Sequence, residues 1–337
     1  MNAPLRLCLD GDALASNWRW LQLQSGAAAC GAAVKANGYG LGAVEVATRL
    51  AAAGCRDFFV ATWAEAAEIE AILPPDAQLS VLHGVRDEDM AVALASRARP
   101  VLNTAAQVSR WRPTGRPCDV MIDTGMNRLG LAPGDDLSGL QIETLMSHLA
   151  SADEDVAQNA AQRAAFVAAA KGVAARRLSL ANSAGICLGA DYHFGLTRPG
   201  LALYGGIPRP EAEASLLPVV GLEVQVLQRR RVTAGQSVGY NATFTADRTL
   251  EVAIVHLGYA DGYLRAFSGT GSAAAGAYSV IGRVSMDLVA LDVTAAPVNE
   301  GDWVAMDFGL SAAAAQSGLS PYELLTLLGR RYERRWS

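Results

Sequence analysis

Hydrophobic and polar residues follow two patterns along the chain, and the change comes near residue 217. Before it, short apolar and β-branched runs alternate with runs at helical spacing, which is typical of parallel βα units. Eight runs predict strands: 28–35, 58–62, 79–83, 100–103, 120–123, 145–148, 178–182 and a short one ending near 198. The helices predicted between them include 63–73, 87–97 and 156–174, the last with Ala161, Ala164, Ala165 and Ala168 on one face.

Most of these strands end at a polar residue. The polar residues whose side chains could carry chemistry are Lys35, Asp123, His148, Asn182 and Arg198. Eight parallel βα units in about 200 residues match the lower size limit of a TIM barrel, whose active site lies at the carboxyl ends of the strands. We therefore predict an α/β fold in which residues 11–216 form a TIM (β/α)8 barrel with these side chains at its mouth.

After residue 217, apolar and polar residues alternate with period two, as in half-buried strands. The segments with this alternation are 222–226, 250–254 and 280–288. Helical runs are absent until about residue 321. Residues 217–337 are therefore predicted to be a mainly β C-terminal domain, with residues 1–10 as a candidate edge strand.

Composition narrows the class of protein. The chain has 337 residues, 51% of them hydrophobic, which suits two domains with large cores. A net charge of -5 gives no basic field for nucleic acid. Five scattered cysteines without a CxxC pair argue against a disulfide framework and against a metal site. Neither a signal peptide nor a membrane-spanning run is recognised, so no membrane association is predicted and a cytoplasmic location is expected.

A glycine-rich turn follows Lys35 and raises a first alternative. Residues 38–43 fit the GxGxxA pattern of dinucleotide-binding folds, with Asp57 near the required distance. In that fold the acidic residue closes the second strand, whereas Asp57 opens the run that follows it. Eight βα units also exceed a single dinucleotide-binding domain, so a nicotinamide enzyme is disfavoured.

Six short motifs, taken together and in order, resemble the alanine racemase family. They are VKANGYG at 34–40, IDTGMNRLG at 122–130, ANSA at 181–184, RPG at 198–200, GYADG at 258–262 and GRVSMD at 282–287. The resemblance spans nearly the whole chain. It implies a barrel with a C-terminal β domain, pyridoxal 5'-phosphate bound to the barrel lysine, and an isomerase that interconverts L-alanine and D-alanine.

The resemblance also assigns the cofactor contacts. Lys35 is implied to form the Schiff base with the cofactor, and an amine at a barrel mouth is well placed for imine chemistry. Tyr39, Ser183 and Gly200 match the phosphate-binding positions of the family. Ser183 and Gly200 follow the seventh and eighth strands, where TIM barrels commonly bind phosphate.

Arg198 resembles the arginine that faces the pyridine nitrogen of the cofactor, and His148 matches the histidine that supports it. A guanidinium that stays protonated disfavours protonation of the ring nitrogen. The cofactor is then a weaker electron sink, which limits side reactions such as transamination.

Racemisation needs two acid/base groups, one on each face of the substrate carbon. By resemblance these are Lys35 and Tyr240, with Tyr240 contributed by the β domain of a partner subunit. The resemblance therefore implies a homodimer with shared active sites. A free tyrosine with a pKa near 10 is ionised only to about one part in a thousand at pH 7, so its surroundings must help it act as a base.

Four residues are implied to handle the substrate alanine. Arg128 resembles the arginine that contacts the cofactor oxygen and the substrate carboxylate, and Met286 the residue whose backbone N–H meets that carboxylate. Tyr259 and Asp287 match the entryway residues of the family.

The sequence departs from the family at two places. Near the C-terminus, where some relatives have another phosphate-binding tyrosine, this chain has Leu328-Gly329-Arg330, so that contact is not implied here. The other departure concerns Arg128. Many members carry a carbamylated lysine that bonds to the arginine equivalent to Arg128, and this chain has Met121 there. The group that orients Arg128 is left open, with Asn127 or a bound anion as candidates.

Three rival functions remain. A racemase of the same architecture with broader specificity, or one acting on serine or lysine, is an alternative because the sequence does not measure pocket size. A decarboxylase on a related barrel would leave Tyr240 and the two motifs after residue 257 unexplained. A non-catalytic pyridoxal phosphate-binding barrel protein would lack the β domain altogether.

Overall fold

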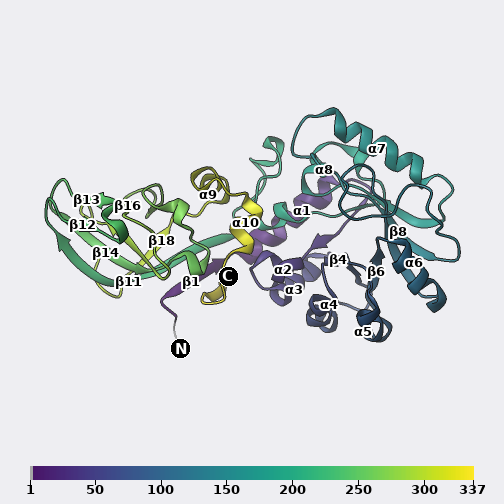
Figure 1. Cartoon of the computed structure of the whole chain (residues 1–337), viewed down its shortest axis with the longest axis horizontal. Coiled ribbons are helices and arrows are strands. Elements are labelled where there is room, and N and C mark those ends of the chain that lie inside the picture. The colour runs from purple at the N-terminus through teal and green to yellow at the C-terminus, as the bar shows by residue number, and fades with distance from the viewer. Residues whose placement is uncertain (1–2) are drawn as a thin grey trace. The chain divides into compact units, whose positions relative to one another are not determined.

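The computed structural model describes residues 3–337, which form two compact units (Figure 1). One unit is Ala13–Leu217, and the other joins residues 3–12 to Pro218–Ser337. Within the described residues no helix combines the length and apolar character needed to cross a membrane.

The first unit is built on one parallel sheet. Its strands are β2 (Ala29–Cys30), β3 (Ala32–Ala33), β4 (Asp57–Val60), β5 (Gln78–Val81), β6 (Arg99–Leu102), β7 (Pro117–Met121), β8 (Gln141–Met146), β9 (Ala175–Ser179) and β10 (Leu196–Thr197). The strand order is β2-β10-β9-β8-β7-β6-β5-β4-β3. Because β2 and β3 are the two halves of one strand, interrupted at Gly31, the ends of this order meet and close the barrel. The predicted TIM barrel is thereby confirmed.

Gly31 allows the close approach on which this closure depends. A Cβ atom there would lie 2.8 Å from the backbone oxygen of Asp57 and 2.9 Å from the ring of Phe59. Only a residue without a side chain permits the first strand to pair with β4 at this distance.

Helices alternate with these strands. They are α1 (Gly11–Gln24), α2 (Lys35–Tyr39), α3 (Ala43–Ala53), α4 (Trp63–Ile69), α5 (Met90–Ala95), α6 (Ala105–Trp111), α7 (Ala157–Ala170) and α8 (Ser183–Cys187). The alanine face predicted for α7 is not its buried face. Its buried residues are Asn159, Gln162 and Phe166. Both amides bind backbone groups of the loop after β8, with Gln162 accepting from Ala150 N at 2.9 Å and Asn159 donating to Ser151 O at 3.0 Å.

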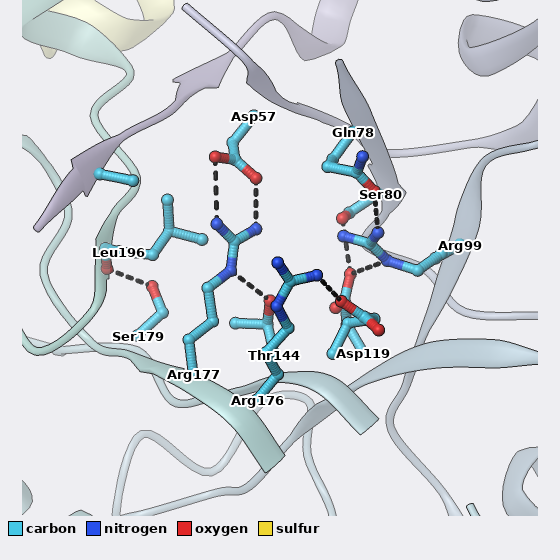
Figure 2. A network of polar contacts seen from close by, with 12 residues as sticks. Asp57, Gln78, Ser80, Arg99, Asp119, Thr144, Arg176, Arg177, Ser179 and Leu196 are labelled. Carbon is cyan, nitrogen blue, oxygen red and sulfur yellow. Dashed lines mark hydrogen bonds and ion pairs between the residues drawn. The ribbon is translucent and has the colours of Figure 1, made fainter. Parts of the chain in front are cut away.

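The barrel interior holds a network of buried polar side chains (Figure 2). Arg177 forms a bidentate ion pair with Asp57 from β4. Asp119 from β7 accepts a hydrogen bond from Ser80 at 2.6 Å and lies 3.5 Å from Arg99. These contacts give partners to charges that would otherwise be costly to bury.

The second unit is mainly β. Its large sheet has the order β14-β17-β16-β15-β18-β11-β1-β19, and an additional β14–β11 pairing closes six of the strands into a barrel. The strands are β1 (Leu5–Leu9), β11 (Val220–Val232), β14 (Leu250–His256), β15 (Ser272–Ala273), β16 (Tyr278–Ile281), β17 (Leu288–Asp292), β18 (Trp303–Met306) and β19 (Glu333–Trp336). A separate hairpin joins β12 (Ser237–Val238) to β13 (Phe244–Thr245).

Three details of this unit differ from the sequence-based predictions. The N-terminal strand β1 lies between β11 and β19, so it is an interior strand and not an edge. A helix, α9 (Leu310–Ser317), precedes the predicted one, α10 (Pro321–Thr326). Residues 282–287 form a loop between β16 and β17, so the alternation over 280–288 includes a non-strand segment.

Candidate active site

Lys35 lies at the mouth of the barrel, two residues after β3. The turn behind it is left-handed, with φ of 53° at Ala36, 54° at Asn37, 61° at Gly38 and 54° at Tyr39. A left-handed conformation costs non-glycine residues roughly 1–2 kcal/mol each. Three of these four residues carry a side chain, so the surrounding contacts must hold this turn in place.

Tyr39 leaves this turn and packs against a second tyrosine that the motif analysis did not select. The rings of Tyr39 and Tyr204 stack with centroids 4.6 Å apart. Tyr204 is fully buried, and its hydroxyl donates to Ala33 O at 2.9 Å. A Cβ atom on Gly200 would lie 2.2 Å from the hydroxyl oxygen of Tyr39. The Tyr39 hydroxyl therefore lies directly over the backbone of Gly200.

Ser183 faces the same backbone segment. Its hydroxyl oxygen accepts the N–H of Gly200 at 2.9 Å and the N–H of Ala202 at 3.2 Å. With both acceptor positions used, the hydroxyl hydrogen is available to donate. Ser183, Tyr39 and Gly200 thus lie together and bring two hydroxyls to one backbone segment, an arrangement that fits a phosphate group.

Arg198 is buried at the end of β10. Its two terminal nitrogens donate to Ser147 O at 2.6 Å and to the hydroxyl of Ser179. Among the residues that the structure describes, Nε of Arg198 has no partner, so this N–H is free for a bound group. Burial lowers the pKa of Arg198 to about 10, against the opposing charge of Asp119, so the guanidinium is still protonated at neutral pH.

Lys35 and His148 lie within range of the same positive charges. Burial and the charge of Arg128 lower the pKa of the Lys35 amine, and Glu65 opposes them. Burial, followed by the charges of Arg198, Arg128 and Lys35, lowers the pKa of His148 to about 3. His148 is therefore neutral at pH 7, and the Lys35 amine is easier to deprotonate than an ordinary lysine.

Arg128 lies on a loop that begins with a tight turn. The carboxylate of Asp123 accepts backbone N–H groups of Gly125, Met126 and Asn127 at 2.9, 3.0 and 3.1 Å. Asp123, predicted at the barrel mouth, thus stabilises this turn by accepting three backbone hydrogen bonds.

The Arg128 side chain is exposed, and within residues 3–337 it forms no hydrogen bond or ion pair. Met121 is buried in β7, and its side chain has no polar group that could replace the family lysine. Asn127, one of the two candidates for orienting Arg128, uses its backbone N–H on Asp123 and makes no hydrogen bond to Arg128.

The remaining predicted site residues belong to the second unit. Tyr240 begins a short 3₁₀ turn and is 65% exposed. It lines a groove of about 890 Å³ together with Arg230, Arg231, Arg283 and Ser285. This exposed tyrosine therefore shares a groove with several cationic residues.

Met286, Tyr259 and Asp287 come together through backbone contacts and an arginine. Met286 O accepts the N–H of Ala260 at 3.1 Å. Arg331 donates to Asp287 at 2.7 Å and to the fully buried Asp261 at 2.6 and 2.8 Å.

Comparison with known proteins covers the chain almost end to end. The family model "Alanine racemase, N-terminal domain" matches residues 9–208, and "Alanine racemase, C-terminal domain" matches residues 219–336. The chain belongs to the alanine racemase family. The family resemblance inferred from the six motifs is thereby confirmed.

Individual alanine racemases agree closely with the chain. The alanine racemase of Methylobacterium nodulans is 43% identical over 354 residues, covering 98% of this chain and 95% of the relative. The biosynthetic alanine racemase of Agrobacterium fabrum is 40% identical over 370 residues, covering 99% and 94%. A crystal structure of alanine racemase from Bartonella henselae with covalently bound pyridoxal phosphate matches with a TM-score of 0.93, at 34% identity and 100% coverage of both chains. The predicted class, an isomerase that uses pyridoxal phosphate to racemise alanine, is confirmed.

Some residues of the site have no motif that points to them. Tyr204 is recognisable only from its stack on Tyr39, and Ser147 acts on Arg198 through a backbone carbonyl, which any residue could supply. Glu65 is detectable as the fourth residue of the helix-start pattern Thr-x-x-Glu, but its bond to the turn after Lys35 is a tertiary contact.

Proposed function

We propose that this alanine racemase uses two bases from two chains, Lys35 on one face of the substrate and the partner subunit's Tyr240 on the other. The observation that carries the proposal is the arrangement at the barrel mouth. There the Lys35 amine has a lowered pKa, Arg198 is buried, and the Ser183 hydroxyl is bonded to the backbone N–H of Gly200.

The barrel residues suit pyridoxal phosphate. Tyr39, Ser183 and the backbone at Gly200 would hold the phosphate, and Nε of Arg198 would donate to the ring nitrogen. When bound, the cofactor supplies an electron sink that acidifies the Cα–H bond of an amino acid joined to it. A guanidinium cannot give up its proton to the ring nitrogen at neutral pH, so Arg198 keeps that sink weak.

Lys35 would first hold the cofactor and then, once the substrate has replaced it there, move a proton at Cα. A base for this step must be uncharged at the working pH. The lowered pKa of the Lys35 amine serves that need, and neutral His148 adds no further positive charge around Arg198.

Tyr240 is the proposed second base, and its exposure supports a site completed by another chain. In the second unit its side chain is 65% exposed, which suits a residue that reaches into a partner. Arg230, Arg231 and Arg283 line the same groove as Tyr240. A symmetric homodimer would place two such tyrosines on two barrels.

The substrate carboxylate would bind to Arg128 and the backbone N–H of Met286. Arg128 is exposed and has no competing partner among the described residues, so it is free to meet an anion. Tyr259 and Asp287 are proposed to line the entry, where Arg331 holds Asp287.

We also propose domain limits at 11–216 and 217–337.

The test follows isotope exchange at Cα for each enantiomer separately. In deuterated water the Tyr240→Phe variant is expected to lose racemisation but to keep exchange of one enantiomer through Lys35. It should also keep the absorbance of the lysine-bound cofactor. Tyr322→Phe, which changes another exposed tyrosine of the same unit, is the matched control and should racemise normally. Racemisation by Tyr240→Phe at the wild-type rate would remove Tyr240 from the mechanism.

A further inference from the structure

Glu65 connects the start of α4 to the turn behind Lys35. Its Oε1 accepts the backbone N–H of Ala36 at 2.8 Å. Its Oε2 accepts the N–H of Ala61 at 2.6 Å and that of Thr62 at 3.3 Å. Each carboxylate oxygen therefore accepts backbone N–H groups, and the donors to the two oxygens belong to two separate segments of the barrel.

This geometry requires a carboxylate. Glutamine has one acceptor oxygen and one NH₂ group that can only donate. In the place of Glu65 it could satisfy Ala36 or the start of α4, but not both. A carboxylate that only capped α4 would need a single oxygen directed at the helix start, as in an ordinary capping box.

The bond to Ala36 lies at a sensitive position. Ala36 follows Lys35 directly and is the first residue of the left-handed turn. The turn is also tied to the start of α3 by Asn37, whose Oδ1 accepts the N–H of Ala43 at 2.9 Å. Losing the bond at Ala36 would free the end of the turn that carries the amine, and catalytic groups lose efficiency with displacements of about 1 Å.

We propose that Glu65 is a positioning residue for Lys35, because its carboxylate holds the turn that follows the amine in the conformation needed to meet the cofactor. The proposal rests on the function of Lys35 proposed above.

The experiment separates this role from helix capping. Thr62→Ala removes the other half of the capping box, the acceptor of Glu65 N at 3.3 Å, and leaves the bond to Ala36 intact. Glu65→Ala removes both connections, Glu65→Gln removes one of them, and Glu65→Asp keeps the charge with a shorter reach. For each purified variant we would measure the affinity for pyridoxal phosphate by absorbance, kcat and KM for alanine, and thermal unfolding.

Glu65→Gln is expected to bind pyridoxal phosphate about 10- to 100-fold more weakly and to lose kcat by a similar factor, the size expected for one charge-assisted hydrogen bond. Glu65→Asp should fall between wild type and Glu65→Gln. Thr62→Ala should keep affinity and kcat within about twofold while its unfolding midpoint falls by about 2–4 °C.

If Glu65→Ala and Glu65→Gln both match Thr62→Ala in affinity and kcat, Glu65 is only a helix cap and the proposal is overturned. The affinity measurement does not depend on racemisation. A wild-type protein whose cofactor affinity falls when Glu65 is replaced, yet which leaves L-alanine unchanged, would contradict the proposed function and leave the positioning role standing.

Discussion

Replacing Gly200 by alanine adds one methyl group where the Tyr39 ring crosses the backbone. The new Cβ would lie 2.2 Å from the hydroxyl oxygen of Tyr39 and 2.9 Å from its ring carbon Cζ. Ordinary carbon contacts need about 3.5 Å, so the end of the ring must move by roughly 1 Å.

The ring has little freedom to make this movement. Tyr39 is buried and its own backbone is left-handed. Its ring stacks on Tyr204, whose hydroxyl donates a hydrogen bond to Ala33 O. Overpacking of this kind costs about 1–3 kcal/mol of folding free energy. If the Tyr39 hydroxyl binds the phosphate as proposed, moving it away would remove a hydrogen bond to a charged group, worth about 1.5–3 kcal/mol, or roughly 10- to 100-fold in cofactor affinity.

The assay is a double-mutant cycle on Gly200→Ala and Tyr39→Phe, with urea unfolding of the apoprotein and absorbance titration with pyridoxal phosphate. Tyr39→Phe removes the atom at 2.2 Å, so the double variant should recover part of the lost stability but none of the lost affinity. Gly309→Ala is the control, because a Cβ there meets nothing within 4 Å. A Gly200→Ala protein with wild-type stability and affinity would refute this reasoning. So would a double-mutant cycle in which the effects of the two substitutions on stability simply add.

Two further predictions concern buried charge. The pKa of His148 is about 3 in the folded protein and about 6.5 when unfolded, so below about pH 6.5 the unfolded state gains a proton that the folded state does not, and stability falls as the pH falls. His148→Asn should therefore reduce the slope of unfolding free energy between about pH 6 and pH 4 by up to about 1.4 kcal/mol per pH unit in urea titrations; an unchanged slope would show that His148 titrates normally. Arg331→Ala leaves the buried carboxylate of Asp261 without its arginine and should cost about 2–3 kcal/mol in denaturant unfolding. Arg335→Ala, which breaks only the partly exposed pair with Glu333, should change stability by less than about 0.5 kcal/mol, and equal losses in the two variants would contradict the ion-pair account.

Most of the barrel could be predicted from hydrophobic patterning. Strands buried on both faces read as continuous apolar runs, and each predicted run overlaps or closely adjoins an observed strand, with some boundaries shifted by a few residues. The pattern placed the alanines of α7 on one face but did not show which face is buried, because small apolar residues tolerate solvent; the buried face carries amides that bind the loop after β8.

The limits of prediction in the β unit have a similar origin. Whether β1 lies at an edge or inside the sheet depends on the strand that pairs with its second side, and that strand, β19, is more than 300 residues away in the chain. The interior position follows from long-range pairing, which alternation within residues 1–10 cannot reveal.

For the site, the motifs supplied the residues but not their conformation. Nothing in the pattern VKANGYG indicates that Ala36 and Asn37 adopt a left-handed turn, because that conformation is held by contacts from Glu65 and from the start of α3. The stack of Tyr39 on Tyr204 is likewise visible only in three dimensions.

The central claim is that each active site takes Lys35 from one chain and Tyr240 from another. It is tested most directly by mixing the inactive variants Lys35→Ala and Tyr240→Phe under conditions that exchange subunits. Half of the dimers would be mixed, and each would hold one site with both bases intact, so alanine racemisation should return to about one quarter of the wild-type rate. If both bases came from the same chain, no mixed dimer would hold an intact site, and the mixture would stay as inactive as its components.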